Sequence, residues 1–114
     1  MNLHLSYHAT KEFEMTVTRD QVLSRLRAHQ AELERSGIRS IAVFGSVARG
    51  DNTARSDVDL MGDFDSNAGL TLFDMVGIER RLEEILQAPV DLSDRRMLKL
   101  QVKLRADREA ILAF

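Results

Sequence analysis

The sequence has no cysteine and no tryptophan, a single proline (Pro89), a single tyrosine (Tyr7) and only 5% aromatic residues. Without cysteine, the chain can form no disulfide framework, thiol nucleophile or Cys-ligated zinc site. The scarcity of aromatic side chains removes the platforms on which single-stranded nucleic acids stack. No apolar run approaches the roughly 20 residues that span a bilayer, and the amino end lacks the basic and then apolar pattern of a secretory signal. We therefore expect a cytoplasmic protein that does not bind membranes.

What the chain does have is the composition of one globular domain. Of its 114 residues, 44% are hydrophobic and 30% are charged, which is typical of a folded, soluble protein. A chain of this length buries roughly two-thirds of its unfolded surface, enough for one modest core and no separate substrate-holding domain. Its 16 Lys and Arg against 18 Asp and Glu give a formal net charge of -2. This balance argues against direct binding of nucleic acid, which favours a basic surface.

The first half of the chain reads as one helix followed by two strands. Thr18, with Gln21 three residues later, has the pattern of a capping box, and Ser36–Gly37 is typical of a helix end, so we expect one helix between them. Short apolar runs predict strands over 38–44 and 57–64, separated by a helical turn at 47–49 and a polar loop at 51–56. Gly62 would mark a bulge in the second strand.

The second half reads as helix, strand and helix. Apolar residues recur at helical spacing from Leu72 to about Gln87, a short strand follows over 89–92, and Ser93–Asp94 would cap a last helix. Two apolar stripes should face the core: Leu72, Phe73, Val76, Leu82, Ile85 and Leu86 on the first helix, and Met97, Leu100, Leu104 and Ile111 on the last.

This order of elements indicates an α+β fold, with a small mixed β-sheet and helices packed on one face. The order in which the strands pair stays open. We expect one domain over residues 18–114, preceded by an extension of uncertain structure over residues 1–17. In that extension Leu3, Leu5 and Tyr7 alternate with polar residues, which weakly suggests a strand.

The first chemical feature is Gly45–Ser46, where the first strand runs into a helical turn. Backbone N–H groups and a hydroxyl at such a turn favour a phosphate, and glycine lets the backbone approach the anion closely. Arg49, one turn further on, could add a fixed cation for phosphate.

The second feature is the pair Asp57 and Asp59, at positions i and i+2 of the second strand. Both carboxylates would project from one face of the sheet, where they repel each other unless a cation lies between them. A hard divalent ion such as Mg²⁺, which binds carboxylates together with substrate phosphates, is the natural partner.

The third feature is Asp91, in the short strand Val90–Asp91–Leu92. If this strand lies beside the one that carries Asp57 and Asp59, three carboxylates share one face. That arrangement suits a two-metal site for phosphoryl or nucleotidyl transfer. Each feature alone is commonplace, but their combination over so short a stretch is not.

Taken together, the segments 45–50 (GSVARG) and 56–60 (SDVDL) resemble the signature of the minimal nucleotidyltransferases, in the polymerase-beta-like nucleotidyltransferase superfamily. The resemblance runs from about Thr18 to the last residue and includes Asp91, at the place of the family's third acidic residue. Residues 1–14 precede the usual start, and Met15 resembles the family's first residue. The family's fold is a small mixed sheet flanked by helices.

The resemblance implies a magnesium-dependent enzyme whose substrate is ATP. Gly45 and Ser46 would hold the β- and γ-phosphates, and Arg49 and Ser56 would support nucleotide binding. Asp57, Asp59 and Asp91 would be the catalytic residues and would hold two Mg²⁺ ions. Stand-alone members of this size resemble antitoxins that transfer AMP to a tyrosine hydroxyl of a HEPN-domain ribonuclease toxin, and we expect such a toxin as the partner.

Two other functions remain open from the sequence. The same site could transfer AMP to a small hydroxylated molecule such as an aminoglycoside. Alternatively, the chain could neutralise a toxin by binding alone, without catalysis.

The last predicted helix is basic. A solvated face is the simpler interpretation of its cations, but they could also meet an acidic partner or the phosphates of ATP, because this helix follows the strand that carries Asp91. Its basic residues are Arg95, Arg96, Lys99, Lys103 and Arg105.

Overall fold

The computed structural model describes residues 16–114. The strand pattern at Leu3, Leu5 and Tyr7, and the proposed family start at Met15, lie outside the described residues. Val17 is buried in the core, and its carbonyl accepts a hydrogen bond of 2.8 Å from the Asn52 side chain.

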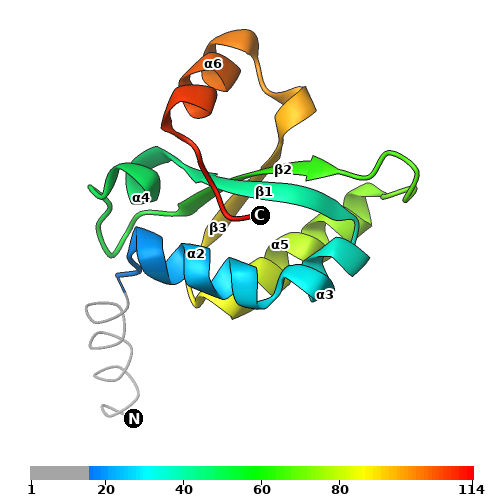
Figure 1. Cartoon of the computed structure of the whole chain (residues 1–114), viewed down its shortest axis with the longest axis horizontal. Coiled ribbons are helices and arrows are strands. Elements are labelled where there is room, and N and C mark those ends of the chain that lie inside the picture. Colours follow the sequence, from blue (N-terminus) through cyan, green and yellow to red (C-terminus); the bar gives the residue numbers. More distant parts are fainter. Residues whose placement is uncertain (1–15) are drawn as a thin grey trace.

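A four-stranded mixed sheet forms the centre of the structure, with the strand order β3-β2-β1-β4 (Figure 1). Strand β1 pairs antiparallel with both β2 and β4, whereas β2 pairs parallel with β3. The α+β class and the mixed sheet are as the sequence indicates. The strands are β1 (Ile38–Phe44), β2 (Val58–Phe64), β3 (Val90–Asp94) and β4 (Ile111–Leu112).

Three helices cover one face of this sheet: α2 (Arg19–Ala28), α3 (Gln30–Arg35) and α5 (Leu72–Leu86) (Figure 1). The predicted capping box is present, because Gln21 N–H donates to Thr18 Oγ1 and Thr18 N–H donates to Gln21 Oε1. The single helix expected from Thr18 to Ser36 is wrong, since the chain leaves helical geometry at His29 (φ -107°, ψ 16°). There the imidazole lies 2.9 Å from the Arg25 carbonyl, a local contact that competes with the helix.

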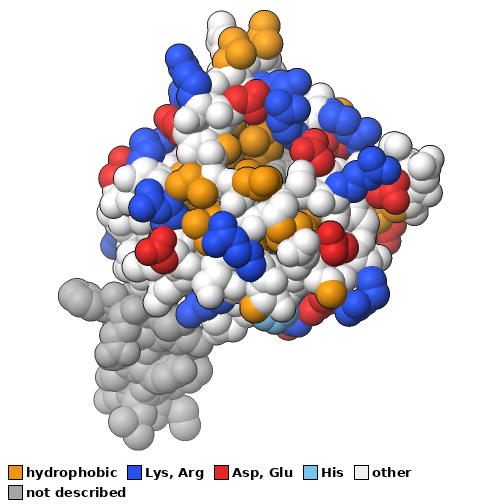
Figure 2. Space-filling view, in the orientation of Figure 1, with side chains coloured by type: hydrophobic (Ala, Val, Ile, Leu, Met, Phe, Trp, Pro, Cys, Tyr) orange, Lys and Arg blue, Asp and Glu red, His pale blue; other side chains and the backbone are white. Residues whose placement is uncertain are grey.

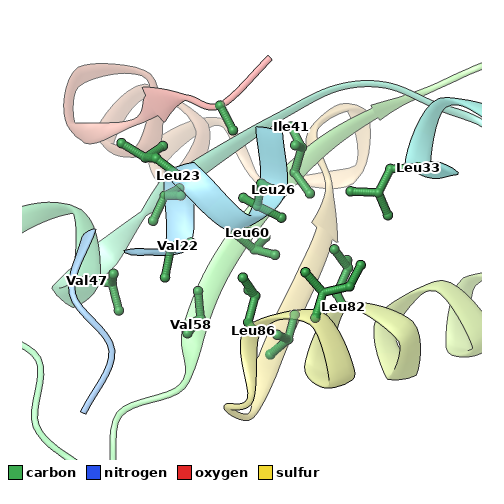
Figure 3. Packing of buried hydrophobic residues seen from close by; sticks show 14 of the residues in the cluster. Val22, Leu23, Leu26, Leu33, Ile41, Val47, Val58, Leu60, Leu82 and Leu86 are labelled. Carbon is green, nitrogen blue, oxygen red and sulfur yellow. The ribbon is translucent and has the colours of Figure 1, made fainter. Parts of the chain in front are cut away.

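The core lies between these helices and the sheet (Figure 3). Strand β2 shows how it is built: Val58 and Leu60 are fully buried against α2 and α5, while Asp59 between them points to the opposite face. Burial of each such side chain stabilises the fold by about 1.5–3 kcal/mol. The other fully buried large side chains are Val22, Leu26, Leu33, Ile38, Ile41, Val43, Val47, Leu82 and Leu86.

The apolar stripe of α5 differs from the predicted one. Leu82, Ile85 and Leu86 face the core as expected. Leu72 and Phe73 are instead 80% and 89% exposed, and Val76 is also exposed. The helix has room for one core stripe, and Met75 rather than Val76 continues it towards the helix start.

Helix α5 also protects the edge strand β3. The Val90 N–H donates to Glu83 (3.1 Å) and the Leu92 N–H donates to Glu79 (3.0 Å). These two carboxylates satisfy backbone donors that would otherwise be open to pairing with another strand.

The last helix, α6 (Leu100–Glu109), lies over the other face of the sheet, after a 3-10 turn η1 (Arg95–Met97) (Figure 1). Asp94 caps η1 through the Arg96 N–H, so the predicted capping pair starts a short turn and not α6. A small second core forms under α6 from Ala42, Met61 and Ala106.

The predicted apolar stripe of the last helix is wrong. Met97, Leu100 and Leu104 are 54–80% exposed, because the small side chains of Ala106 and Ala110 make the contact instead. Ile111 is not helical. It belongs to β4, which the sequence pattern missed and which pairs with β1 at Val43.

The expected bulge at Gly62 is also misplaced. Gly62 pairs regularly with Ile41 on one side and Asp94 on the other. The irregularity lies in β1, where the register passes from Ile38 opposite Phe64 to Ser40 opposite Asp63. Within residues 16–114, none of the helices has the length and the apolar character needed to cross a membrane.

The core account can be tested at Leu60, which is fully buried on the strand that carries Asp59. We expect Leu60→Ala to lower the free energy of unfolding by about 2–5 kcal/mol. Leu104→Ala, at an exposed position of α6, should change it by no more than about 0.5 kcal/mol. Urea unfolding measures both, and equal losses would contradict this placement of the core.

Candidate active site

The parallel pairing of β2 with β3 brings two acidic side chains together. Asp59 and Asp91 are register partners in this pair, so their side chains lie side by side on the sheet face opposite the main core. Asp57 lies directly before β2, two residues from Asp59, and is exposed. The structure thus answers the pairing question that the sequence left open.

The charges of Asp91 and Asp57 act on the Asp59 carboxyl. Its partial burial raises the pKa of its carboxyl, and the nearby Asp91 and Asp57 charges raise the pKa further, against a smaller lowering by Arg49. The three carboxylates therefore form one electrostatic group, in which ionised Asp59 is destabilised by its surroundings.

Gly45 lies against this acidic group, at the start of the short helix α4 (Gly45–Arg49). Its φ of 72° is in the left-handed region, which glycine adopts without strain. A Cβ atom at this position would also overlap Oδ2 of Asp59 and lie 3.1 Å from its Cγ. Two independent constraints therefore require glycine here, and they place the Gly45–Ser46 backbone in contact with the Asp59 carboxylate.

Arg49, at the end of α4, is occupied by two carboxylates. Its Nε donates to Asp51 (3.1 Å) and its Nη1 donates to Glu109 of α6 (3.1 Å). The hydrogen bond that Arg49 donates to Asp51 is the main cause that raises the pKa of Arg49, with Glu109 contributing. Arg49 thus links the loop after α4 to α6 in this structure.

Ser56 has a local role in the loop before β2. Its hydroxyl accepts the Thr53 N–H (2.9 Å), and its own N–H donates to the Thr53 carbonyl (3.0 Å). These bonds close a turn that leads the chain into Asp57. Ser56 does not line the cavity described next.

A cavity of about 290 Å³ lies between the acidic face of the sheet, α4 and α6. Of the predicted site residues, Gly45, Ser46, Arg49 and Asp59 line one side of it, whereas Ser56, Asp57 and Asp91 do not line it. Helix α6 forms the other side, a wall that the motif does not include. The residues that α6 contributes are Val102, Arg105, Ala106 and Glu109.

These α6 residues carried only a partial signal in the sequence. Their spacing of three and four residues marks one helical face, but no local pattern says that this face turns to the site. Arg105 was among the cations that could meet ATP phosphates. No local pattern marks Glu109, because its partner Arg49 lies 60 residues away in the sequence.

A second cavity, of about 570 Å³, lies at the far end of β3, near Leu92 and Asp94. It is lined mainly by apolar side chains of α5 and the preceding loop, and contains none of the three acidic residues. We place the chemistry in the smaller cavity because Asp59 and the Gly45–Ser46 turn meet there.

The acidic group at the smaller cavity suits Mg²⁺: Asp59 lines the cavity, and Asp57 and Asp91 lie beside Asp59. Carboxylate oxygens are the ligands that this ion prefers, and a cation between Asp59 and its neighbours would relieve the repulsion that raises the Asp59 pKa. Within residues 16–114, no three carboxylate or imidazole groups are already drawn together to metal-binding distance. The carboxylates of Asp57, Asp59 and Asp91 thus fit Mg²⁺ by their chemistry and by their position close to one another.

Comparison with known proteins agrees with this geometry. The model of the nucleotidyltransferase domain family matches residues 23–112, which is most of the chain. The chain belongs to this family. The match spans the Gly45–Ser46 turn, the acidic pair Asp57 and Asp59, and the strand that carries Asp91.

Individual relatives match two thirds or more of this nucleotidyltransferase. It is 38% identical over 96 residues to the protein adenylyltransferase MntA of Thermococcus cleftensis, which covers 83% of this chain and 95% of the relative. It is 40% identical over 76 residues to a candidate protein adenylyltransferase of Methanocaldococcus jannaschii, and this match covers 66% of this chain and 86% of the relative.

Solved structures share the fold of this nucleotidyltransferase domain. The structure of a candidate minimal nucleotidyltransferase matches with a TM-score of 0.72 and 33% identity, over 84% of this chain and 96% of that one. A toxin–antitoxin crystal structure with AMP-PNP matches with a TM-score of 0.63 and 18% identity, over 86% and 73%. At that identity, the second likeness concerns the fold alone.

The Gly45 contact can be tested against Gly50, which also has a positive φ (81°) but has open space where a Cβ would lie. Both Gly45→Ala and Gly50→Ala should lose about 1–2 kcal/mol of stability through left-handed strain. Only Gly45→Ala should displace the Asp59 carboxylate, and we expect it to lower nucleotidyl transfer about 100-fold relative to Gly50→Ala. Thermal melts and a transfer assay measure the two effects, and equal transfer activities would contradict the contact.

Proposed function

We propose that this nucleotidyltransferase transfers AMP from ATP to a tyrosine hydroxyl of a HEPN-domain ribonuclease toxin and thereby silences it as an antitoxin. The observation that carries the proposal is the placement of Asp59, which lies beside Asp91 on the sheet and against Gly45, with which it lines one cavity. The similarity to a relative named a protein adenylyltransferase, over 95% of that relative's length, supports a protein acceptor. The toxin–antitoxin structure with AMP-PNP shares the fold, which is compatible with such a pairing.

The nucleotide would enter with its polyphosphate on the Gly45–Ser46 turn. Glycine keeps this backbone free of a side chain, so its N–H groups and the Ser46 hydroxyl can approach the β- and γ-phosphates. Arg49 would support the same end of the nucleotide from α4. Ser56 would act indirectly, by fixing the turn that delivers Asp57.

In the reaction, the acceptor oxygen attacks the α-phosphorus of ATP. A new P–O bond forms to the hydroxyl, the bond between the α-phosphorus and the bridging oxygen to the β-phosphate breaks, and pyrophosphate leaves. Asp91 is exposed on the outer strand beside Asp59, and it would take the hydroxyl proton.

Asp57, Asp59 and Asp91 would hold two Mg²⁺ ions. When bound, Mg²⁺ supplies charge neutralisation at the phosphates and makes the acceptor hydroxyl more acidic. Ionised Asp59 is needed for this role, and its raised pKa means that acid should impair the site before it protonates an ordinary aspartate.

The direct test is to incubate the protein with ATP, Mg²⁺ and a HEPN-domain partner encoded beside it, and to measure the intact mass of the partner. We expect an increase of one or more AMP units and loss of ribonuclease activity. Asp59→Asn should reduce the rate more than about 100-fold, because the electrostatic contribution of such a site is several kcal/mol. Chelation of Mg²⁺ should abolish the adduct.

Asp63→Asn is the matched control. Asp63 lies further along β2 and accepts a hydrogen bond from Ser40 (3.0 Å) outside the site, so its variant should transfer AMP at close to the wild-type rate. A partner that gains no AMP from the wild-type protein would contradict the proposal. Full neutralisation by Asp59→Asn at the same dose would instead indicate a binding antitoxin, and protection of cells from an aminoglycoside would indicate a small-molecule acceptor.

A further inference from the structure

One face of α6 forms a wall of the active-site cavity. Val102, Arg105, Ala106 and Glu109 lie on that face and line the cavity opposite the Gly45–Ser46 turn. Ala106 is buried against the sheet in the second core, which fixes the height of the helix above the acidic face. The position of Arg105 is therefore set by packing at its immediate neighbour.

Two ion pairs tie α6 to the rest of the site. Asp107 pairs with Arg95 of η1 (3.1 Å), and Glu109 pairs with Arg49 of α4 (3.1 Å). One pair attaches the helix to the segment that follows β3, and the other attaches it to the helix that follows Gly45. These contacts position the wall relative to both halves of the site.

The charges in the cavity leave one cation available. Asp59 and Glu109 bring negative charge, and Arg49 is occupied by Asp51 and Glu109. Arg105 is exposed and lines the cavity, and within residues 16–114 no carboxylate forms an ion pair with it. Figure 2 shows basic and acidic side chains interspersed over the face of the molecule in view.

We propose that Arg105 is a phosphate-binding residue, which contacts the polyphosphate of the nucleoside triphosphate from α6 while the Gly45–Ser46 turn contacts it from the other side. A guanidinium can donate two parallel hydrogen bonds to phosphate oxygens and stays charged at any physiological pH. Such a cation would also offset the repulsion between a polyphosphate and the carboxylates of Asp59 and Glu109, which line the same cavity. This inference rests on the proposed function, because it takes that function's substrate as the ligand.

The test compares Arg105→Gln with Arg108→Gln by calorimetry, using a non-hydrolysable ATP analogue with Mg²⁺ and, separately, AMP. Arg108 is an exposed arginine of the same helix that does not line the cavity. We expect Arg105→Gln to raise the Kd of the analogue about tenfold, with Arg105→Lys between it and the wild type. The Kd of AMP, and both Kd values of Arg108→Gln, should stay within about twofold of the wild type.

The proposal is overturned if Arg105→Gln binds the analogue with the Kd of the wild type, or if Arg108→Gln raises that Kd as much as Arg105→Gln does. It is overturned as well if Arg105→Gln raises the Kd of AMP as much as the Kd of the analogue. It is also overturned if the wild type does not bind the analogue. A tenfold effect of Arg105→Gln without AMP transfer to a toxin would defeat the proposed function alone. If the protein transfers AMP to a toxin and Arg105→Gln changes neither the KM for ATP nor the kcat of that reaction, this inference alone is defeated.

Discussion

The parallel pairing of β2 with β3 is the constraint on which the site depends, because it places the Asp59 and Asp91 carboxylates side by side. Parallel neighbours need a long crossover, and α5 supplies it on the face that holds the core. The core helices α2, α3 and α5 thus lie on one face of the sheet (Figure 1). The opposite face is left for the acidic residues, Gly45 and the wall formed by α6.

This arrangement has an energetic cost. The pKa of Asp59 is raised in the folded protein, so its ionisation opposes folding: the free energy of unfolding falls as pH rises through the raised pKa, and the cost persists at neutral pH. Fully buried Val58 and Leu60, on either side of Asp59, offset it from the other face of the same strand. The ion pairs of α6 with Arg95 and Arg49 are half-exposed, so they orient the helix more than they stabilise the fold.

Local patterns sufficed where one segment determines its own structure. Strand β1, the Thr18–Gln21 capping box and the turn after Phe44 follow from short stretches of sequence, and so does the resemblance that joined Gly45 to Asp59. Features that depend on distant partners were missed. The two-residue strand β4 exists only because β1 pairs with it, the exposed stripe of α6 reflects packing through Ala106, and the Arg49–Glu109 pair joins segments far apart in the sequence.

The central claim is that Asp59 and Asp91 act as one electrostatic group, and the most direct measurement is the pKa of the Asp59 carboxyl by NMR, without Mg²⁺, in the wild type and in Asp91→Asn. The account predicts a pKa above the ordinary value of about 3.9 in the wild type. It also predicts a lower pKa in Asp91→Asn, because removal of a neighbouring negative charge eases ionisation. An Asp59 pKa that is the same in both proteins would contradict the account.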